Sequence, residues 1–268
     1  MPRITRRQDA IVTRFRDVAK GAADDGAVVI DGVHLLLDAL RAGVPVETVL
    51  ATSDLLADAS QDVAQTWRLA RAADVPIHEA TAGVIEAASP VRTPSGVVAI
   101  ARWSPAPLAG LWTPAPALVI GLVDVQDPGN AGAVIRSADG LGATGVAMIG
   151  ATADPGSAKS LRGAMGSTFR VPVARASIGE SLRAARAAGA TIAATTAPAP
   201  GTTDLHAADL TGPVFLLLGN EGAGLPGQAL KAADIQISIA MRPGINSFNV
   251  AVSSALLLYE ARLQRNRR

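Results

Sequence analysis

Three stretches in the second half of the chain combine polar side chains with glycine in patterns that can bind and orient a substrate. They are DPGNAGAVIR at 127–136, LLLGNEGAGL at 216–225 and SFNVAV at 247–252. In the first stretch, Gly132 and Arg136 are spaced i and i+4, so on a helix they share a face where a substrate backbone can approach the guanidinium. A guanidinium with a pKa above about 12 is a poor base, so Arg136 is predicted to stabilise an anion and to hold a phosphate.

The other two stretches offer backbone and polar groups at the ends of a strand and a helix. The apolar strand before Gly219 runs into glycines whose backbone can bend around a flat ligand, and Glu221 is the only charge there. Ser247 is predicted to cap a long final helix over 248–265 that has Asn249 in its first turn. Each motif taken alone also fits a plain structural role: a surface arginine, a tight turn or a capped helix.

Composition and context exclude several other chemistries. The chain has no cysteine, which removes disulfides, thiolate metal sites, iron–sulfur clusters and a cysteine nucleophile. The three histidines, His34, His78 and His206, lie far apart in the sequence, so we expect no metal site. Residues 222–227 read GAGLPG and match G-x-G-x-x-G. A dinucleotide site is not expected there, because Pro226 lacks the N–H that a pyrophosphate needs at a helix start.

The charge is balanced overall and basic at both ends. The chain carries 24 basic and 23 acidic residues, yet residues 1–20 have a local net charge of +4, and the chain closes with Arg262, Arg265, Arg267 and Arg268. Basic ends on a neutral body favour contacts with the phosphates of a nucleic acid. The first twenty residues lack an apolar signal core and no run of about 18 apolar residues occurs, so we expect a cytoplasmic protein without a membrane partner.

Two α/β domains joined by a linker are needed to position these motifs. Short apolar runs alternate with helical periodicity over 1–106, which predicts a small βαβ-type domain. The proline-rich stretch 107–117 has no periodicity and is predicted to be a linker. From 118 to 268 the strands are continuous apolar runs, which indicates a parallel sheet covered on both faces. The predicted strands cover 27–30, 46–52, 75–80, 93–103, 118–124, 145–150, 190–196, 213–220 and 235–240. The predicted helices cover 4–20, 32–43, 60–74, 130–142 (capped by Asn130), 178–189 and 248–265, and residues 157–168 also have a helical pattern.

The three motifs, in this order, resemble those of one family. N-x-G-x-x-x-R at 130–136, G-N-E-G-x-G-L at 219–225 and S-F-N-V-x-V at 247–252 are similar to the motifs of the SpoU/TrmH family of RNA ribose 2′-O-methyltransferases, within the SPOUT superfamily. The similarity covers residues 118–265, including SAKSLRGAMGSTFRVPV at 157–173. In the N-terminal third, ITRRQ, VVIDGVHLLLDAL and TPSGVVAIA resemble the substrate-binding domain of rRNA-acting members, which is similar to small RNA-binding ribosomal proteins.

This resemblance implies a C-terminal SPOUT α/β domain with a deep trefoil knot, and S-adenosylmethionine as its cofactor. Phe248 stands where leucine is usual in the third motif, and it is still apolar. The family's cofactor contacts correspond to Leu218, Gly219, Ile239, Met241 and Phe248. The family's polar catalytic set corresponds to Arg136, Asn130, Glu221, Ser247 and Asn249. Members are dimers, and the apolar final helix suits either a homodimer interface or an intramolecular core through Val250, Val252, Leu256 and Leu257.

The reaction that the resemblance implies is methylation of a ribose 2′-hydroxyl of RNA, with 23S rRNA as the expected substrate. A 2′-hydroxyl has a pKa far above 7, so catalysis requires positioning and a field that favours the alkoxide, which is the role predicted for Arg136. The proton is expected to leave to a substrate phosphate or to water. Two alternatives stay open: a tRNA ribose methyltransferase, against which the extra N-terminal domain argues, and a catalytically silent rRNA-binding assembly factor.

Overall fold

The computed structural model of the protein describes residues 3–21, 26–245 and 247–267. These residues fall into two compact units. Unit 1 comprises residues 1–104 together with 156–169, and unit 2 comprises 105–155 together with 170–268. The chain therefore passes from one unit to the other three times, because a segment of its second half belongs to unit 1.

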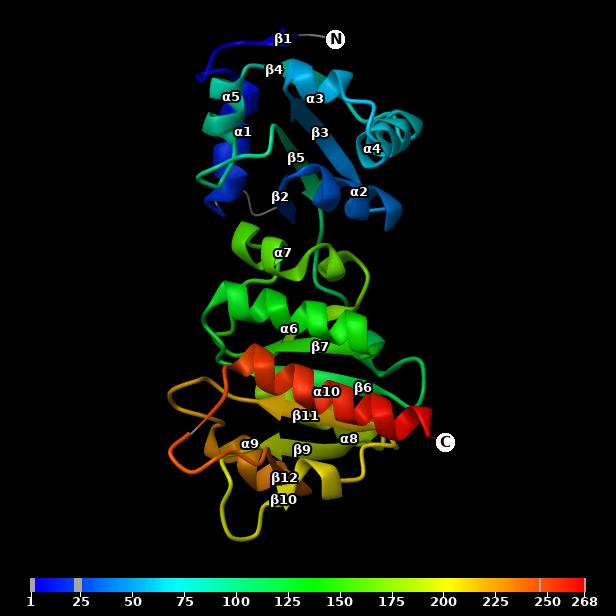
Figure 1. The fold of residues 1–268 in the computed structure, drawn as a ribbon, viewed down its shortest axis with the longest axis vertical. Coiled ribbons are helices and arrows are strands. Elements are labelled where there is room, and N and C mark those ends of the chain that lie inside the picture. Colours follow the sequence, from blue (N-terminus) through cyan, green and yellow to red (C-terminus); the bar gives the residue numbers. More distant parts are fainter. Residues whose placement is uncertain (1–2, 22–25, 246, 268) are drawn as a thin grey trace. The chain divides into compact units, whose positions relative to one another are not determined.

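Unit 1 contains five strands within the described residues. They are β1 (Arg3–Ile4), β2 (Ala27–Asp31), β3 (Val46–Ala51), β4 (Ile77–Ala80) and β5 (Val97–Arg102). They form a mixed sheet in the order β1-β4-β3-β5-β2, in which β5 is antiparallel to both of its neighbours (Figure 1). The four strands predicted for this part of the chain are confirmed, and β1 is an addition that pairs with β4 at the edge.

Helices pack on both faces of the unit 1 sheet. They are α1 (Ala10–Ala19), α2 (Val33–Arg41), α3 (Ser53–Ala57), α4 (Gln61–Ala72), α5 (Ala82–Ala88) and α7 (Ala158–Ala164). Along β2, Val28 faces one apolar cluster and Val29 the other, since successive side chains of a strand point to opposite faces. Helices α2, α4 and α7 contribute Leu36, Trp67 and Leu161 to the first cluster, whereas α1 and α5 contribute to the second.

Helix α1 is shorter than predicted, and two short helices were not predicted. Helix α1 begins at Ala10, because Asp9 caps it by accepting a hydrogen bond from the backbone N–H of Ile11. The residues before Asp9 include β1 instead of a first helical turn. Helices α3 and α5 have five and seven residues, which is too short for a periodic apolar pattern to emerge.

Most basic residues near the N-terminal end are engaged within unit 1. Arg3, Arg7 and Arg14 each form an ion pair with a glutamate of the same unit. The guanidinium of Arg16 donates a hydrogen bond to the backbone carbonyl of Ala87. Fewer cations of this segment are therefore available for the predicted phosphate contacts than its net charge indicates.

Unit 2 is built on a sheet whose described strand pairs are all parallel, which confirms the predicted parallel sheet. The strands are β6 (Leu118–Val123), β7 (Gly145–Ile149), β8 (Val173–Ala176), β9 (Thr191–Thr195), β10 (Thr203–Asp204), β11 (Val214–Leu218) and β12 (Ile235–Ser238). Their order is β10-β12-β9-β11-β6-β7-β8. Every residue of β6 and β11 is buried, as their continuous apolar runs require, whereas β8 and β10 are short and were not predicted.

The helices of unit 2 are α6 (Pro128–Leu141), α8 (Ile178–Ala187), α9 (Gly227–Ala232) and α10 (Val250–Asn266). Val119 of β6 shares an apolar cluster with Leu182 of α8 and Ala229 of α9. Helices α6 and α10 pack against each other and lie side by side in front of the strands in Figure 1. None of the helices in the described part of the chain has the length and apolar character needed to cross a membrane.

The stretch predicted to be a linker is structured and contributes to the core of unit 2. It contains a 3₁₀ helix, η1 (Leu108–Trp112), in which Leu111 is fully buried. A Cβ on Gly145 would come within 2.6 Å of the Leu111 side chain, so β7 and η1 are in direct contact. The hydroxyl of Thr144 donates to the carbonyl of Leu111 at 2.7 Å. The prolines of this stretch thus shape a packed segment instead of a flexible connection.

The basic C-terminal end is also engaged in the fold. The guanidinium of Arg265 donates hydrogen bonds to four backbone carbonyls, those of Pro116, Ala117, Leu210 and Gly212. Burial lowers the pKa of Arg265, because desolvation penalises the charged form. Arg262 donates to the carbonyl of Gly140. Arg265 therefore closes the end of α10 onto unit 2, phosphate contacts by the exposed Arg262 and Arg267 stay a prediction, and Arg268 lies outside the described residues.

Candidate active site

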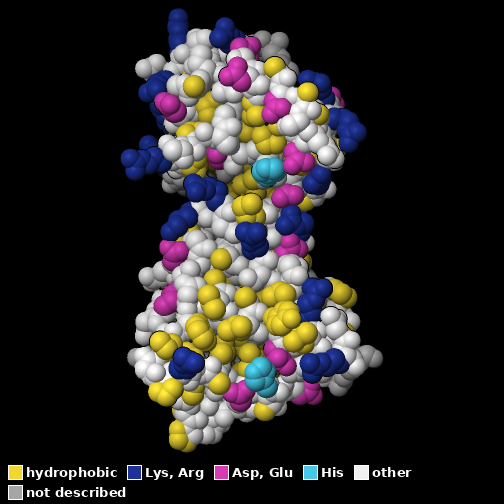
Figure 2. Space-filling view, viewed as in Figure 1, with side chains coloured by type: hydrophobic (Ala, Val, Ile, Leu, Met, Phe, Trp, Pro, Cys, Tyr) yellow, Lys and Arg dark blue, Asp and Glu magenta, His cyan; other side chains and the backbone are white. Residues whose placement is uncertain are grey.

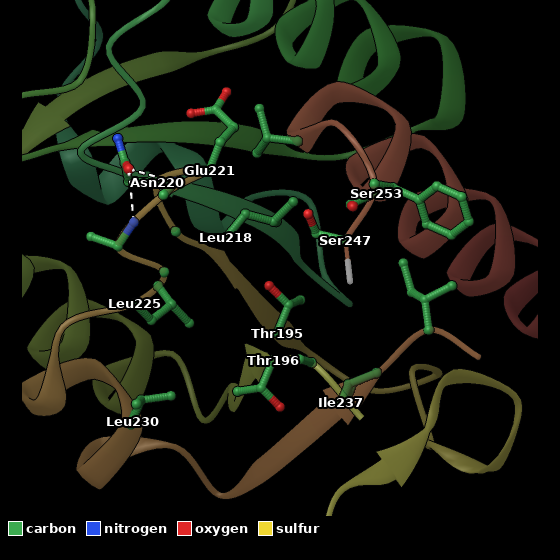
Figure 3. Close-up of a pocket in the computed structure, with 18 of the residues that line it drawn as sticks. Thr195, Thr196, Leu218, Asn220, Glu221, Leu225, Leu230, Ile237, Ser247 and Ser253 are labelled. Atoms are coloured by element: carbon green, nitrogen blue, oxygen red, sulfur yellow. Dashed lines mark hydrogen bonds between the residues drawn. The ribbon is translucent and has the colours of Figure 1, made fainter. Parts of the chain in front are cut away.

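Loops at the carboxyl ends of three neighbouring strands, β9, β11 and β12, enclose a pocket of about 510 Å³ in unit 2 (Figure 3). Parallel strands place these ends at one edge of the sheet, where α/β proteins bind ligands. The pocket is lined mainly by residues 195–197, 218–225, 237–241 and 247–253. All five residues predicted to contact a cofactor line it: Leu218, Gly219, Ile239, Met241 and Phe248. Glu221 and Ser247 of the predicted polar set line it as well.

Gly219 lies where the loop after β11 crosses its own backbone. A Cβ at this position would lie 2.3 Å from the carbonyl carbon of Gly224 and 2.5 Å from the nitrogen of Leu225. Both are backbone atoms that cannot turn away as a side chain can. The loop closes on itself through a hydrogen bond from the N–H of Gly224 to the carbonyl of Asn220 at 2.8 Å. The pocket wall therefore has its present shape only with glycine at 219.

Asn220 holds this loop together, and the sequence analysis did not single it out. Its Oδ1 accepts hydrogen bonds from the N–H groups of Gly222 and Ala223, at 2.8 and 3.0 Å. Its Nδ2 donates to the backbone carbonyl of Asp124 at 2.9 Å, which ties the loop to the end of β6. An asparagine among glycines is a turn signal, because its side chain can bond the backbone two residues on. That signal was present in the GNEGAG stretch.

The backbone at Asp124 adopts a rare conformation that presents its carbonyl to Asn220. Its φ is +57°, in the left-handed region that few residues other than glycine and asparagine adopt readily. The Asp124 carboxylate accepts a hydrogen bond from the N–H of Ala151 at 2.7 Å. A Cβ on Gly150 would lie 2.3 Å from the same carboxylate oxygen, so the chain at the end of β7 also requires glycine. The ends of β6 and β7 thus form a fixed base for the pocket loop.

The caps of the two helices at the site differ from those predicted. Asp127, not Asn130, caps α6: its carboxylate accepts from the N–H of Asn130 at 2.9 Å, and Pro128 occupies the first turn. Asn249, not Ser247, caps α10 by accepting from the N–H of Ala251 at 2.9 Å. Both differences have one cause, since each helix start offers several capping residues and only the backbone conformation decides between them. Asn130 therefore has its side chain available for other contacts.

Three of the predicted polar residues form one hydrogen-bonded chain between separate elements. Asn249, at the start of α10, donates from Nδ2 to Oδ1 of Asn130 at 3.1 Å. Asn130, in the first turn of α6, donates from Nδ2 to Oε1 of Glu221 at 2.6 Å. Glu221 and Asn249 are exposed and Asn130 is half-buried, and Glu221 also lines the pocket. The arrangement places two amides and a carboxylate where a second substrate can meet a ligand held in the pocket.

Arg136 lies apart from this chain of polar residues. It is exposed on α6, about 9 Å along the helix from Asn130, and its side chain makes no hydrogen bond or ion pair with a described residue. It does not line the pocket. Gly132, predicted to leave an open face beside the guanidinium, is buried. The expected approach of a substrate backbone at Gly132 therefore has no exposed surface to use, whereas Arg136, one turn further along α6, faces solvent.

The site has the features of one class of α/β protein. A parallel sheet with a glycine-lined pocket at the carboxyl ends of its strands is how many such enzymes bind an organic cofactor. Within the ranges that the structure describes, no group of three or more His, Cys, Asp or Glu side chains is placed to hold a metal ion. The fold and the site together therefore define an α/β enzyme. The polar side chains of its site carry amide, carboxylate and hydroxyl groups.

Comparison with known proteins gives the family. The SpoU rRNA Methylase family matches residues 117–259, and the MRM3-like substrate binding domain matches residues 19–99. The chain belongs to the SpoU rRNA methylase family, so the resemblance seen in the three motifs is confirmed. The first match contains the pocket, the polar chain and Arg136, and the second lies within unit 1.

Similar proteins include RNA methyltransferases of known target. The 23S rRNA (uridine(2479)-2′-O)-methyltransferase of Streptomyces viridochromogenes is 42% identical over 142 residues, which are 52% of this chain and 50% of that protein. The 23S rRNA (guanosine(2553)-2′-O)-methyltransferase of Bacillus subtilis is 28% identical over 87% of this chain and 88% of its own length. The structure of an AdoMet-bound rRNA methyltransferase from Sinorhizobium meliloti is 31% identical, covers 97% of both chains and superposes with a TM-score of 0.86.

We expect Asn220→Ala to weaken binding of S-adenosylmethionine about ten- to a hundredfold, since it removes three hydrogen bonds worth roughly 0.5–1.5 kcal/mol each. The reason is that the loop loses its tie to Asp124 as well as two internal bonds. Isothermal titration calorimetry measures the effect. Gln228→Ala, an exposed change on the neighbouring α9, is the control and should bind as the wild type does. Equal affinities for the two variants would show that Asn220 does not shape the pocket.

Proposed function

We propose that this protein transfers a methyl group from S-adenosylmethionine to a ribose 2′-hydroxyl of 23S rRNA. The observation that carries the proposal is the hydrogen-bonded chain from Asn249 through Asn130 to Glu221, which reaches a cofactor-sized pocket. A volume of about 510 Å³ lies within the ~300–1,000 Å³ of small-molecule sites. The names of the Streptomyces and Bacillus relatives support 23S rRNA as the substrate.

The residues of the pocket fit S-adenosylmethionine. Leu218, Ile239, Met241 and Phe248 supply an apolar surface for an adenine, and Gly219 lets the backbone come close to it. Thr196 also lines the pocket, and its hydroxyl is buried without a hydrogen-bond partner among the described residues, so a polar atom of a ligand would satisfy it. When bound, the cofactor supplies an electrophilic methyl group on a sulfonium. The related Sinorhizobium protein was crystallised with AdoMet.

The chain's own residues position the ribose and stabilise its oxygen. Asn130 and Asn249 hold Glu221 in one orientation, and the three together orient the ribose hydroxyls. Ser247 lines the pocket beside them and adds a hydroxyl. Arg136 contacts the RNA once it is bound, holds a phosphate and favours the developing alkoxide. The guanidinium of Arg136 is a poor base, so the proton of the 2′-hydroxyl passes to a substrate phosphate or to water.

Single-turnover methyl transfer to deproteinised 23S rRNA tests this function. We expect label from methyl-labelled S-adenosylmethionine to appear at one ribose 2′-oxygen of the rRNA, with bulk tRNA as the comparison substrate. Methyl transfer to tRNA alone would show that the protein is a tRNA ribose methyltransferase instead. Binding of both cofactor and rRNA without any transfer would identify a catalytically silent assembly factor.

The trefoil knot that the resemblance implies is part of the same proposal. A knot of this kind requires the chain to thread through a loop of the cofactor domain. The segments that line the pocket at 195–197, 218–225 and 237–241 are the ones that would take part. The match of residues 117–259 to the SpoU rRNA Methylase family supports this assignment.

A homodimer formed through α10 is proposed on the basis of an exposed apolar surface. Val252, Leu256 and Tyr259 follow one another at i, i+4 and i+7 and are 47%, 39% and 53% exposed. With Leu141 of α6 they border an entirely apolar hollow. Val250 and Leu257, which were predicted for the same surface, are buried within unit 2. The final helix therefore contributes one face to the core and leaves the other for a partner.

We expect Val252→Asp to convert the dimer to a monomer at micromolar concentration, because a charge would be buried in an apolar interface. Sedimentation velocity measures the change. The dissociation constant should rise at least about a hundredfold, since an unpaired buried charge costs several kcal/mol. Gln264→Ala is unsuitable as a control, because Gln264 bonds Leu210 and Ala208. Lys231→Ala on α9 changes an exposed charge without touching α10 and should leave the dimer intact. A monomeric wild type would refute the proposed interface.

A further inference from the structure

Unit 1 contains a second pocket, of about 930 Å³. Neither of the two family matches includes all of the residues that line it. Its walls are the start of α2, the loop 91–95 and helix α7. The first two walls lie within the match to the MRM3-like substrate binding domain, whereas α7 lies outside it. A segment encoded between two strands of the methylase sheet thus completes a pocket of unit 1.

Helix α7 is fixed firmly to this unit. Leu161 is fully buried and belongs to the same apolar cluster as Ile30 of the sheet. Beyond the helix the chain turns at Gly166, whose φ is +79° and where a Cβ would lie 2.1 Å from the Asp38 carboxylate. Met165, just before this turn, has φ +48° and is 52% exposed. Met165 ends α7 in the left-handed conformation that often closes a helix, and its apolar side chain is left exposed at the edge of the pocket.

The opposite wall is held in place by Asp31. Its carboxylate accepts hydrogen bonds from the hydroxyls of Ser89 at 2.6 Å and Ser95 at 3.2 Å, which anchors both ends of the loop. Helix α2 starts beside it at Gly32, with no side chain capping its first N–H groups. These N–H groups are donors without an intrahelical partner, and Gly32, Val33 and the next residues line the pocket.

The rim of the pocket is basic. Lys159 and Arg162 are spaced i and i+3 on α7, and both are exposed and line the pocket. Arg92 is exposed on the opposite loop, between two lining residues, Val91 and Thr93. The side chains of Arg92 and Arg162 form no hydrogen bond or ion pair with a described residue. Figure 2 shows Lys and Arg side chains gathered at the level of α7.

The acidic and titratable groups of the pocket are held by other parts of unit 1. Asp31 bonds the two serines, and Asp38 lies under the Met165–Gly166 turn. His34 approaches Asp62 at 3.4 Å. Lys159, Arg162 and Arg92 thus give the rim of the pocket three cationic side chains.

We propose that this pocket binds one unpaired nucleotide of the RNA substrate, with its base between Val91 and Met165 and its phosphate on Lys159 and Arg162. The proposal rests on the proposed RNA methylation and places part of its substrate recognition in unit 1. Proteins read RNA sequence mainly on unpaired bases, which pack against side chains and bond polar groups at their edges. Thr93 and Ser95 supply hydroxyls for a base edge, and Lys and Arg supply phosphate contacts.

The first test compares two double variants of the full chain in equilibrium binding to deproteinised 23S rRNA over a range of salt concentrations. Lys159→Ala with Arg162→Ala removes the proposed phosphate contacts, and Arg68→Ala with Arg71→Ala removes a matched i, i+3 pair from α4. The α7 variant should bind at least about tenfold more weakly, and its slope of log K against log salt should fall by about 2. The α4 variant should keep the wild-type slope. Equal slopes for the two variants would overturn the proposal.

The second test fills the pocket without changing charge. Thr93 is exposed, so Thr93→Trp should keep the melting temperature and the S-adenosylmethionine affinity while weakening RNA binding about tenfold with an unchanged salt slope. A photo-crosslinking residue at position 165 should link to a single unpaired nucleotide. Crosslinks spread along duplex RNA would refute the proposal. The proposal would also be refuted if Thr93→Trp weakened binding to ribosomal subunits but not to naked rRNA. That result would assign the pocket to a protein partner. Because these readouts need no methyl transfer, they are separable from a failure of the proposed activity.

Discussion

Gly219→Val is expected to abolish binding of S-adenosylmethionine, with at least a hundredfold loss of affinity in calorimetry. The added side chain would overlap backbone atoms of Gly224 and Leu225, so the loop has to open and the pocket wall is lost. The loop residues 220–224 are largely exposed, and the strands beneath them are not touched by the change. The melting temperature should therefore fall by only a few degrees, which corresponds to about 1–2 kcal/mol for a chain of this size.

Gly222→Ala is the matched control in the same loop. A Cβ there meets only the Asn220 side-chain oxygen, at 3.4 Å, which is close to ordinary contact. This variant should bind the cofactor within about threefold of the wild type. Wild-type affinity for Gly219→Val would mean that the cofactor does not use this loop. Should Gly219→Val unfold, the smaller Gly219→Ala still separates the two outcomes, since it adds only one carbon at the crossing.

Arg136→Ala is expected to slow single-turnover methyl transfer about a hundred- to a thousandfold while leaving cofactor affinity unchanged. A preorganised charge at a developing oxyanion contributes about 3–4 kcal/mol. Arg136→Lys should recover little of the rate, because one ammonium cannot replace the planar fork of a guanidinium. Since Arg136 is exposed and contacts no described residue, the melting temperature should not change measurably.

Arg183→Ala on α8, another exposed arginine of unit 2, serves as the control for the loss of one positive charge. It should transfer methyl groups at the wild-type rate. Near-wild-type transfer by Arg136→Ala would remove this residue from catalysis. Weaker rRNA binding with a normal single-turnover rate at saturating RNA would leave it only the role of holding a phosphate.

The parallel sheet could be predicted because its signal is local in the sequence, whereas the cofactor contacts were predicted from the resemblance of the three motifs to one family. Strands buried on both faces are continuous apolar runs, and β6 and β11 have this form. The pocket residues follow directly after strands, at Gly219 and Ile239, or precede a helix, at Phe248. In a parallel sheet such positions come together at one edge whatever the details of the loops.

The helix caps could not be predicted from residue types alone. At the start of α6, Asp127 and Asn130 are both good caps, and at the start of α10 both Ser247 and Asn249 are. The choice depends on where the backbone enters the helix, which is set by tertiary packing. It matters for function, because the residue that does not cap α6, Asn130, is the one that bonds Glu221 and Asn249.

The unit to which α7 belongs also could not be predicted from a local sequence pattern. Its periodicity predicts a helix, but the same apolar face would suit either core, and Leu161 enters that of unit 1. For the segment 107–117, the absence of periodicity predicts a linker and gives no sign of the packed 3₁₀ helix. A 3₁₀ helix has a three-residue repeat and a length of one or two turns, so a buried Leu111 produces no pattern to detect.

The three passages of the chain between the units have a consequence for biosynthesis. During translation the residues up to 104 leave the ribosome first, but Leu161, Gly166 and the rest of α7 are still to be made. An apolar patch of the first sheet stays uncovered until about 65 further residues have emerged. Ribosomes add roughly 5–20 residues per second, so this takes several seconds. Unit 1 is thus completed only after β6 and β7 of the second sheet have been synthesised, so a fragment cut at residue 104 lacks part of its own core.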